Sequence, residues 1–219
     1  MWLPGHLAVS FLACTPLVLY YCRRKENLML IIPYIAFFAV LPDFLHFEDL
    51  RTFSHSMIGL TILVLMALVV LHFLFKIRRA QVLIASVAAG AHLGADWLFG
   101  HFFPLYPFSS RYESLNSFNT YIDIQAEIVI FSVAFVVFMI IFLSARTIRR
   151  STELSNSEKW NVVILILPFL GMELLEAAYF LQNMATVGLG VSRMVLLIIF
   201  LTTILGSVIL LRSVISRRR

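Results

Sequence analysis

Nine of the His, Asp and Glu side chains in the first 127 residues lie at or near the ends of apolar runs and are of types that bind divalent metal ions or move protons. In chain order they are His6, Asp43, His46, His55, His92, Asp96, His101, Asp123 and Glu127. Imidazole nitrogens and carboxylate oxygens together form a ligand set suited to zinc and other first-row divalent ions. An ion held by such ligands activates water at neutral pH. These residue types therefore indicate metal-dependent hydrolysis.

Two pairs among these residues have the spacing of neighbours on one helix face. His92 and Asp96 are i and i+4, and Asp123 and Glu127 repeat that spacing. Side chains four positions apart point from the same face of a helix. The residues around His92 are small (AAGAHLGA, 88–95), which lets neighbouring helices approach closely. Close helix packing without any metal explains these small residues equally well.

The elements that must position these side chains are membrane-spanning helices. The chain has 219 residues, of which 61% are hydrophobic and 13% charged, whereas soluble domains carry about 25% charged residues. A span needs roughly 20 apolar residues to cross a hydrocarbon layer of ~30 Å. Such runs occupy residues 6–22, 28–42, 55–75, 80–100, 122–144, 160–181 and 194–215. The sequence predicts an all-α polytopic bundle of about seven helices, forming a single membrane domain over 1–219, whose first two spans are short.

The basic residues predict how this bundle is oriented. Arg23, Arg24 and Lys25 follow the first apolar run, whereas a signal peptide carries its charge before the run. We therefore expect a retained helix, an outer N-terminus and a cytoplasmic C-terminus. The four cytoplasmic clusters are then Arg23/Arg24/Lys25, Lys76/Arg78/Arg79, Arg146/Arg149/Arg150/Lys159 and Arg212/Arg217/Arg218/Arg219. They hold 14 of the 17 basic residues, as the positive-inside rule requires, so the net charge of +5 does not indicate a nucleic-acid partner.

This threading places all nine ionisable groups toward the outer face. A lone histidine at a helix end is more often a hydrogen-bonded interfacial residue than a ligand. Ionisable residues at membrane depth are nevertheless costly and mark a functional or paired site. Their joint placement, from five separate segments, favours a site. His72, at the cytoplasmic end of the third run, is interpreted as a structural residue, and Cys14 and Cys22 as packing residues.

Two further pairs of residues on the outer side each leave two interpretations open. Arg51 and Arg111 either hold an anionic phosphate through paired donors or anchor in lipid headgroups. Glu173 and Glu176 share one face of the sixth run. They either contact the same layer as the nine residues or pair with Arg193.

Four motifs in order resemble the YdjM-like family of membrane-bound, metal-dependent hydrolases. They are LPDFLH (41–46), RTFSHS (51–56), AHLGAD (91–96) and PLYPFSSR (104–111), with His6 ahead of them. The resemblance covers roughly residues 1–130 and leaves 131–219 as additional membrane helices. Leu45 and Leu50 stand where that family usually has an aspartate and a histidine. If those positions complete a metal site in relatives, this chain has fewer ligands or a different occupancy.

The ligand order is also similar to that of zinc-dependent phospholipases C and the related single-strand zinc nucleases. By position, this likeness implies one to three zinc ions, with manganese as the alternative. The implied ligands are His6, Asp43, His55, His92, Asp96, His101, Asp123 and Glu127. In that family the first member of the late pair is histidine, so Asp123 alters the position that would hold a third metal.

The expected function is that of a metal-dependent hydrolase embedded in the cell membrane. A site at the outer, extracytoplasmic headgroup level favours a phosphoester of a lipid or lipid-linked molecule as substrate, with Asp43 or Glu127 as general base. The alternative is a metal-ion transporter, or a metal-binding membrane protein without catalysis. Transport calls for polar groups that continue to the cytoplasmic side and often for an inverted repeat, and neither is visible. Haem binding would not need the carboxylates.

Overall fold

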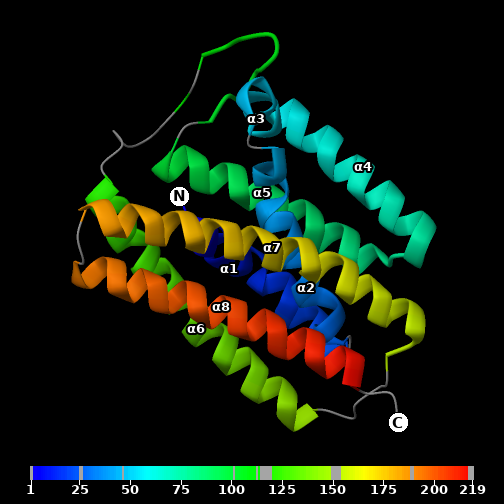
Figure 1. The fold of residues 1–219 in the computed structure, drawn as a ribbon. Helices are drawn as coiled ribbons and strands as arrows, with labels where there is room; N and C mark the ends of the chain where they lie inside the picture. The colour runs from blue at the N-terminus through cyan, green and yellow to red at the C-terminus, as the bar shows by residue number, and fades with distance from the viewer. Residues whose placement is uncertain are drawn as a thin grey trace.

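The described residues of this chain form a bundle of helices (Figure 1). The computed structural model describes residues 2–24, 27–45, 47–100, 102–111, 113, 120–148, 154–187 and 190–216. Within these ranges there is no strand, only an isolated bridge between Phe102 and Glu113. The helices are α1 (Leu3–Arg23), α2 (Leu28–Val40), the 3₁₀ helix η1 (Leu41–Leu45), α3 (Glu48–Ser54), α4 (Met57–Phe75), α5 (Arg79–Phe99), α6 (Thr120–Ile148), α7 (Asn156–Val187) and α8 (Val191–Ser216).

Seven of these helices are long and apolar enough to cross a membrane, which confirms the predicted number of spans. The second span consists of α2 followed by η1. Its 13 α-helical and 5 3₁₀-helical residues extend for about 30 Å at ~1.5 and ~2.0 Å per residue, which is enough for the hydrocarbon layer. Helix α3, with seven residues, is the element that the apolar runs did not predict.

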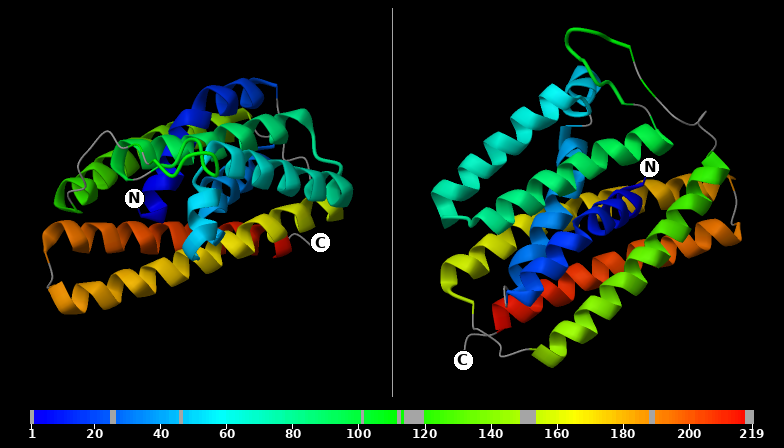
Figure 2. Two further views of the ribbon diagram at one scale, coloured as in Figure 1. Left: turned by 90° about the horizontal axis from the view of Figure 1, so that it is seen from above. Right: turned by 180° about the vertical axis from the view of Figure 1, so that it is seen from behind.

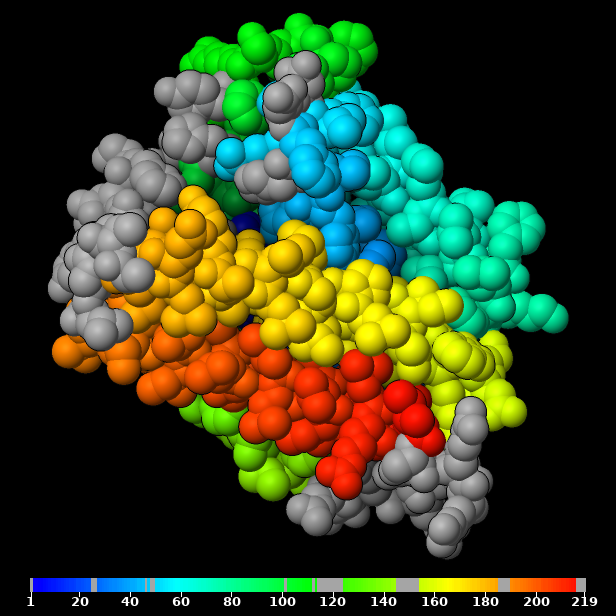
Figure 3. Space-filling model, viewed as in Figure 1, coloured from blue at the N-terminus to red at the C-terminus, as the bar shows by residue number. Residues whose placement is uncertain are grey.

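Helix α1 lies inside the bundle, where it packs against α2, α5 and α6. In the space-filling view α7 and α8 lie side by side and nearly hide it (Figure 3). Its contact with α5 is close: Ser10 Oγ donates to the carbonyl oxygen of Ala88 at 2.9 Å, and Cys14 Sγ approaches that of Ile84 at 3.6 Å. Ala85 and Ala88 are fully buried there. Small residues thus bring the two helices together.

Not all the small residues of α5 take part in this contact. A Cβ added at Gly90 or Gly94 would meet no heavy atom within 4 Å beyond its own helix. The alanines of α5 therefore account for the close approach to α1, and the two glycines do not.

The turn between α3 and α4 depends on a glycine. Ser56 caps α4 by accepting the backbone N–H of Gly59 at 2.9 Å, and a Cβ on Gly59 would collide with the carbonyl group of Phe53. His55 lies in this turn and caps the end of α3. Only glycine therefore allows α3 to fold back so tightly on the first turn of α4.

Substitution of Gly59 by alanine should destabilise the protein. Forcing a methyl group against fixed backbone typically costs about 1–3 kcal/mol, and the displaced turn would carry His55 with it. Thermal unfolding of the detergent-solubilised protein should show a lower midpoint for Gly59→Ala. Gly94→Ala is the matched control, because its Cβ meets open space. Equal midpoints for the two variants would mean that the α3–α4 turn is not held as described.

The two ends of the bundle differ in charge. Arg78 Nη2 lies 3.5 Å from Glu158 Oε1, which joins the α4–α5 turn to the start of α7. Arg23 ends α1, and the exposed His72 lies in the last turn of α4. The spans alternate in direction, so these basic turns lie at one end, and the start of α1 and the end of α5 lie at the other (Figure 2). Which end faces the cytoplasm stays a prediction.

Candidate metal centre

Three histidines and two aspartates meet at the end of the bundle opposite the basic turns. His6 lies in the second turn of α1, and Asp43 in η1. His55 lies between α3 and α4, while His92 and Asp96 lie one turn apart on α5. All five side chains are buried. The structure therefore brings together five of the eight predicted metal ligands, from four separate segments of the chain.

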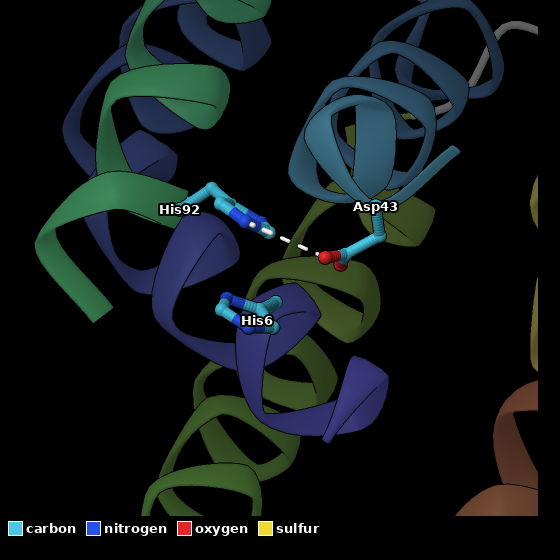
Figure 4. Close-up of side chains that lie close together, drawn as sticks. All are labelled: His6, Asp43 and His92. Carbon is cyan, nitrogen blue, oxygen red and sulfur yellow. Dashed lines mark ion pairs between the residues drawn. The ribbon is translucent and has the colours of Figure 1, made fainter. Parts of the chain in front are cut away.

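The nitrogens and oxygens of this cluster face one another at short range. Asp96 approaches His92 Nε2 at 3.2 Å, His6 Nε2 at 3.4 Å and His55 Nε2 at 3.6 Å. Asp43 Oδ1 lies 3.2 Å from His55 Nε2 and 3.8 Å from His92 Nε2. The rings of His6 and His92 stack with their centroids 3.9 Å apart. Figure 4 shows these two rings with the Asp43 carboxylate directed toward His92.

Hydrogen bonds from the outer ring nitrogens determine the tautomers of two histidines. His92 Nδ1 lies 2.7 Å from the carbonyl oxygen of Ala39, and His55 Nδ1 lies 2.9 Å from that of Arg51. A carbonyl oxygen only accepts, so both Nδ1 atoms must carry the proton and donate. Each Nε2 then faces a carboxylate: His55 Nε2 lies within hydrogen-bonding distance of Asp43 Oδ1, at 3.2 Å, and His92 Nε2 lies 3.2 Å from Asp96 Oδ2. This is the arrangement by which metal-binding histidines are oriented from behind.

The chemistry of these five side chains suits a bound divalent cation better than direct contacts among the side chains alone. Lone pairs of His92 Nε2 and Asp96 Oδ2 face each other, and neither atom makes a hydrogen bond of acceptable geometry. Two buried carboxylates and neutral imidazoles leave a charge of −2, which is costly at this depth unless a cation balances it. Ligands ~2.0–2.1 Å from a tetrahedral zinc ion lie about 3.3 Å apart. The observed separations of 3.2–3.8 Å match that spacing.

Two overlapping sets of three residues bring their potential ligand atoms close together. One consists of His6, Asp43 and His92, and the other of His55, His92 and Asp96, with the ligand atoms of each set within 4.8 Å of one another. His92 belongs to both sets. The arrangement therefore suits one ion held by several of these groups, or two ions close together.

Comparison of the chain with protein-family models, with curated proteins and with solved structures gives no match. The resemblance to the YdjM-like hydrolases thus rests on the four sequence motifs alone. The cluster of five residues is complete without the two positions at which the chain departs from those motifs. Leu50 is exposed on α3, and Leu45 is half-buried in η1.

Two carboxylates near the cluster bind the start of α1. Glu127 Oε1 accepts the backbone N–H of Trp2 at 2.7 Å, and Glu176 Oε2 accepts that of Leu3 at 2.8 Å. The first N–H groups of a helix lack partners within it and carry partial positive charge, so carboxylates stabilise them. These two glutamates position the helix that carries His6. Within the described residues, Glu127 belongs to neither set of potential ligands.

The capping role of these glutamates was not apparent from the sequence. The i, i+4 spacing indicated only that Glu127 lies on a helix face, and Glu176 had two open interpretations. Its hydrogen bond to Leu3 supports the first, contact with the ionisable layer. Glu173, one turn earlier, is fully buried.

The two arginines predicted to bind phosphate have exposed side chains. Arg51 is exposed on α3, where its carbonyl oxygen holds His55. Arg111 is exposed and pairs with Glu113 at 3.3 Å. Their role in binding an anion stays a prediction. His46, His101 and the side chain of Asp123 lie outside the described part of the chain.

Proposed function

We propose that this protein is a membrane-embedded, metal-dependent hydrolase that cleaves a phosphoester of a lipid or lipid-linked substrate. The observation that carries the proposal is the burial of Asp43 and Asp96 among three histidines, two of which, His55 and His92, are held by a backbone carbonyl at Nδ1 so that Nε2 faces the carboxylates. A divalent ion bound there, zinc or manganese, would supply hydroxide at neutral pH and polarise the scissile ester.

The residues of the chain have distinct parts in this proposal. His6, His55 and His92 provide neutral nitrogen ligands, and Asp43 and Asp96 provide negative charge. Ala39 and Arg51 hold two of the rings through their carbonyl oxygens. Asp43 has the second predicted role of general base, which requires an oxygen not committed to metal. Arg51 and Arg111, which belong to the second and fourth of the sequence motifs, are the groups proposed to bind the anionic substrate.

The packing below the cluster supports hydrolysis over transport. An ion path would need polar groups that continue through the bundle. Between α1 and α5, the residues that follow toward the basic end are apolar or small, and they include Phe11, Cys14, Ile84 and Ala85. Among the described residues, the buried acidic and histidine side chains thus gather at one end, although buried polar groups such as Gln81 and Asn161 lie elsewhere. Metal uptake into sealed vesicles containing the protein would revive the transporter interpretation.

Activity should depend on the cluster and on a divalent metal together. Purified protein in lipid nanodiscs should release phosphate or a phosphorylated headgroup from phospholipid or long-chain alkyl phosphate substrates. Asp96→Asn should abolish that release, because the amide loses the charge that binds the ion. If the wild-type protein retains its metal but hydrolyses neither substrate type, it is a metal-binding protein and the hydrolase proposal is wrong.

Substitution of Glu127 by glutamine should leave the metal content unchanged. The amide oxygen of glutamine still accepts the N–H of Trp2, so the start of α1 stays in place. A loss of metal in Glu127→Gln, measured by elemental analysis, would show that Glu127 is a ligand, as the phospholipase-like order implies. Glu127→Ala should weaken binding indirectly, because the start of the His6 helix then loses its carboxylate.

A further inference from the structure

A cavity of about 470 Å³ lies inside the membrane-spanning part of the bundle, between α1, α2, α6, α7 and α8. Its lining is dominated by large apolar side chains, such as Phe11, Met29, Phe138 and Phe169. Its volume falls in the range of ~300–1,000 Å³ that is usual for sites binding small molecules. The cavity is separate from the His/Asp cluster, and none of the five cluster residues lines it.

Few polar atoms in the lining are free to donate a hydrogen bond to an occupant. Three of the four hydroxyl side chains already donate to carbonyl oxygens of their own helix: Thr202 to Ile198, Thr203 to Phe200, and Ser213 to Leu210, at 2.8–2.9 Å. A hydroxyl bound in this way presents mainly its carbon atoms. The surface therefore suits a hydrocarbon, and a polar ligand would lose its hydration without replacement.

The cavity opens sideways, to where lipid would lie. Near the cluster end α6 and α8 are joined by apolar contacts that include Ile124 and Phe200. Farther along, Phe135 on α6 and Ile209 on α8 line the cavity while 44% and 57% exposed. Along α8 the lining runs from Thr202 to Ser213, about 17 Å at ~1.5 Å per residue, which is more than half of the ~30 Å hydrocarbon layer. This shape fits an extended chain.

Two helices lead from this cavity to the metal centre. On α1, Phe11 and Leu7 line the cavity, and His6 follows in the cluster. On α7, Phe169 lines the cavity, the fully buried Glu173 lies one turn farther, and Glu176 holds the start of α1. The cavity and the cluster are thus consecutive along the same two helices.

We propose that this cavity holds one long hydrocarbon chain of a lipid, whose polar end then reaches the metal centre. The surrounding medium supplies such chains at high concentration, and the lateral opening admits them. The role of the polar end at the metal centre rests on the proposed function, whereas binding of the hydrocarbon chain does not. It narrows the substrate to a phosphoester that carries a long single chain able to extend beyond one leaflet.

Photolabelling of the full-length protein in nanodiscs tests this proposal. The probe is a long-chain alkyl phosphate with a diazirine at the end of its chain, and labelled sites are mapped by mass spectrometry. Gly206 lines the cavity, and a Cβ there meets no heavy atom within 4 Å. Gly206→Leu should therefore place its side chain in the cavity, starting from a Cβ that meets open space. Gly171→Leu is the matched control, because Gly171 is exposed, equally open, and outside the lining.

We expect labels on α6 and α8 residues that line the cavity, loss of those labels in Gly206→Leu, and their retention in Gly171→Leu. Metal content should be the same in all three proteins. Labels spread evenly over the lipid-facing helices, unaffected by Gly206→Leu, would overturn the proposal. Cavity labelling in a protein that binds no metal would instead preserve the chain site and refute the hydrolase assignment, so the two failures are distinguishable.

Discussion

Replacement of His92 by alanine should leave the purified full-length protein without bound divalent metal. His92 belongs to both sets of potential ligands, so its loss disrupts each of them. Removal of an outer-shell partner alone lowers metal affinity by about 10- to 100-fold, and loss of a shared direct ligand should exceed that. The measurement is elemental analysis after gel filtration, normalised to protein.

Two controls make this result specific. His72→Ala removes a histidine that is exposed at the other end of α4, and it should retain the wild-type metal content. Circular dichroism should show that His92→Ala is still helical, because the bundle is held by the apolar contacts of α1 with α2, α5 and α6. Wild-type metal content in a folded His92→Ala protein would refute the assignment of this cluster as the metal centre.

Removal of the metal should destabilise the wild-type protein more than any single variant of the exposed surface does. An ion at 100 times its dissociation constant stabilises a protein by about 2.7 kcal/mol. Without it, Asp43 and Asp96 are two buried carboxylates with no metal ion to balance their charge. Treatment with a chelator should therefore lower the thermal unfolding midpoint in detergent, and added zinc should restore it.

The stability order of Asp96→Asn and wild type should reverse when the metal is removed. Asp96→Asn should be less stable than wild type when metal is present, because it cannot bind the ion. After chelation it should be more stable than wild type, because one of the two buried charges has been removed. If chelation leaves the wild-type midpoint unchanged and the order of the two proteins never reverses, the carboxylates are balanced by protonated histidines and not by a metal ion.

The sequence determined most of the cluster because two simple regularities act together. Apolar runs long enough to cross the membrane alternate in direction, so residues at the start of the first span and at the ends of the second and fourth must share one end. This places His6, Asp43 and His92 together without any knowledge of packing. The i, i+4 spacing then adds Asp96 to His92. His55 was predicted to join them because it begins the third apolar run, at the same end of the bundle.

Other features depended on contacts that no local pattern reports. The backbone N–H groups of Trp2 and Leu3 are satisfied by Glu127 and Glu176, which are 125 and 173 residues away in the chain. Spacing on one helix indicates a shared face, but it does not say what that face meets. The ligand role predicted for Glu127 from the late pair stays a prediction, and the structure gives this side chain a different contact, with the backbone of Trp2.

Helix α3 illustrates a different reason for an incomplete prediction. Its seven residues form no apolar run and are too short to show a helical period. The requirement for glycine at position 59 likewise appears only once the Phe53 carbonyl is seen against α4. Yet this turn fixes His55, since the Arg51 carbonyl oxygen orients its ring. A short irregular segment thus completes a site whose other parts were predictable.

Elemental analysis of the wild-type protein tests the central claim most directly. The full-length chain, purified in detergent without chelator, would be incubated with excess zinc or manganese at neutral pH and freed of unbound ions by gel filtration. The geometry of His6, Asp43, His55, His92 and Asp96 predicts at least one divalent ion per chain. A folded protein that retains no metal under these conditions would contradict the metal centre and, with it, the proposed hydrolase.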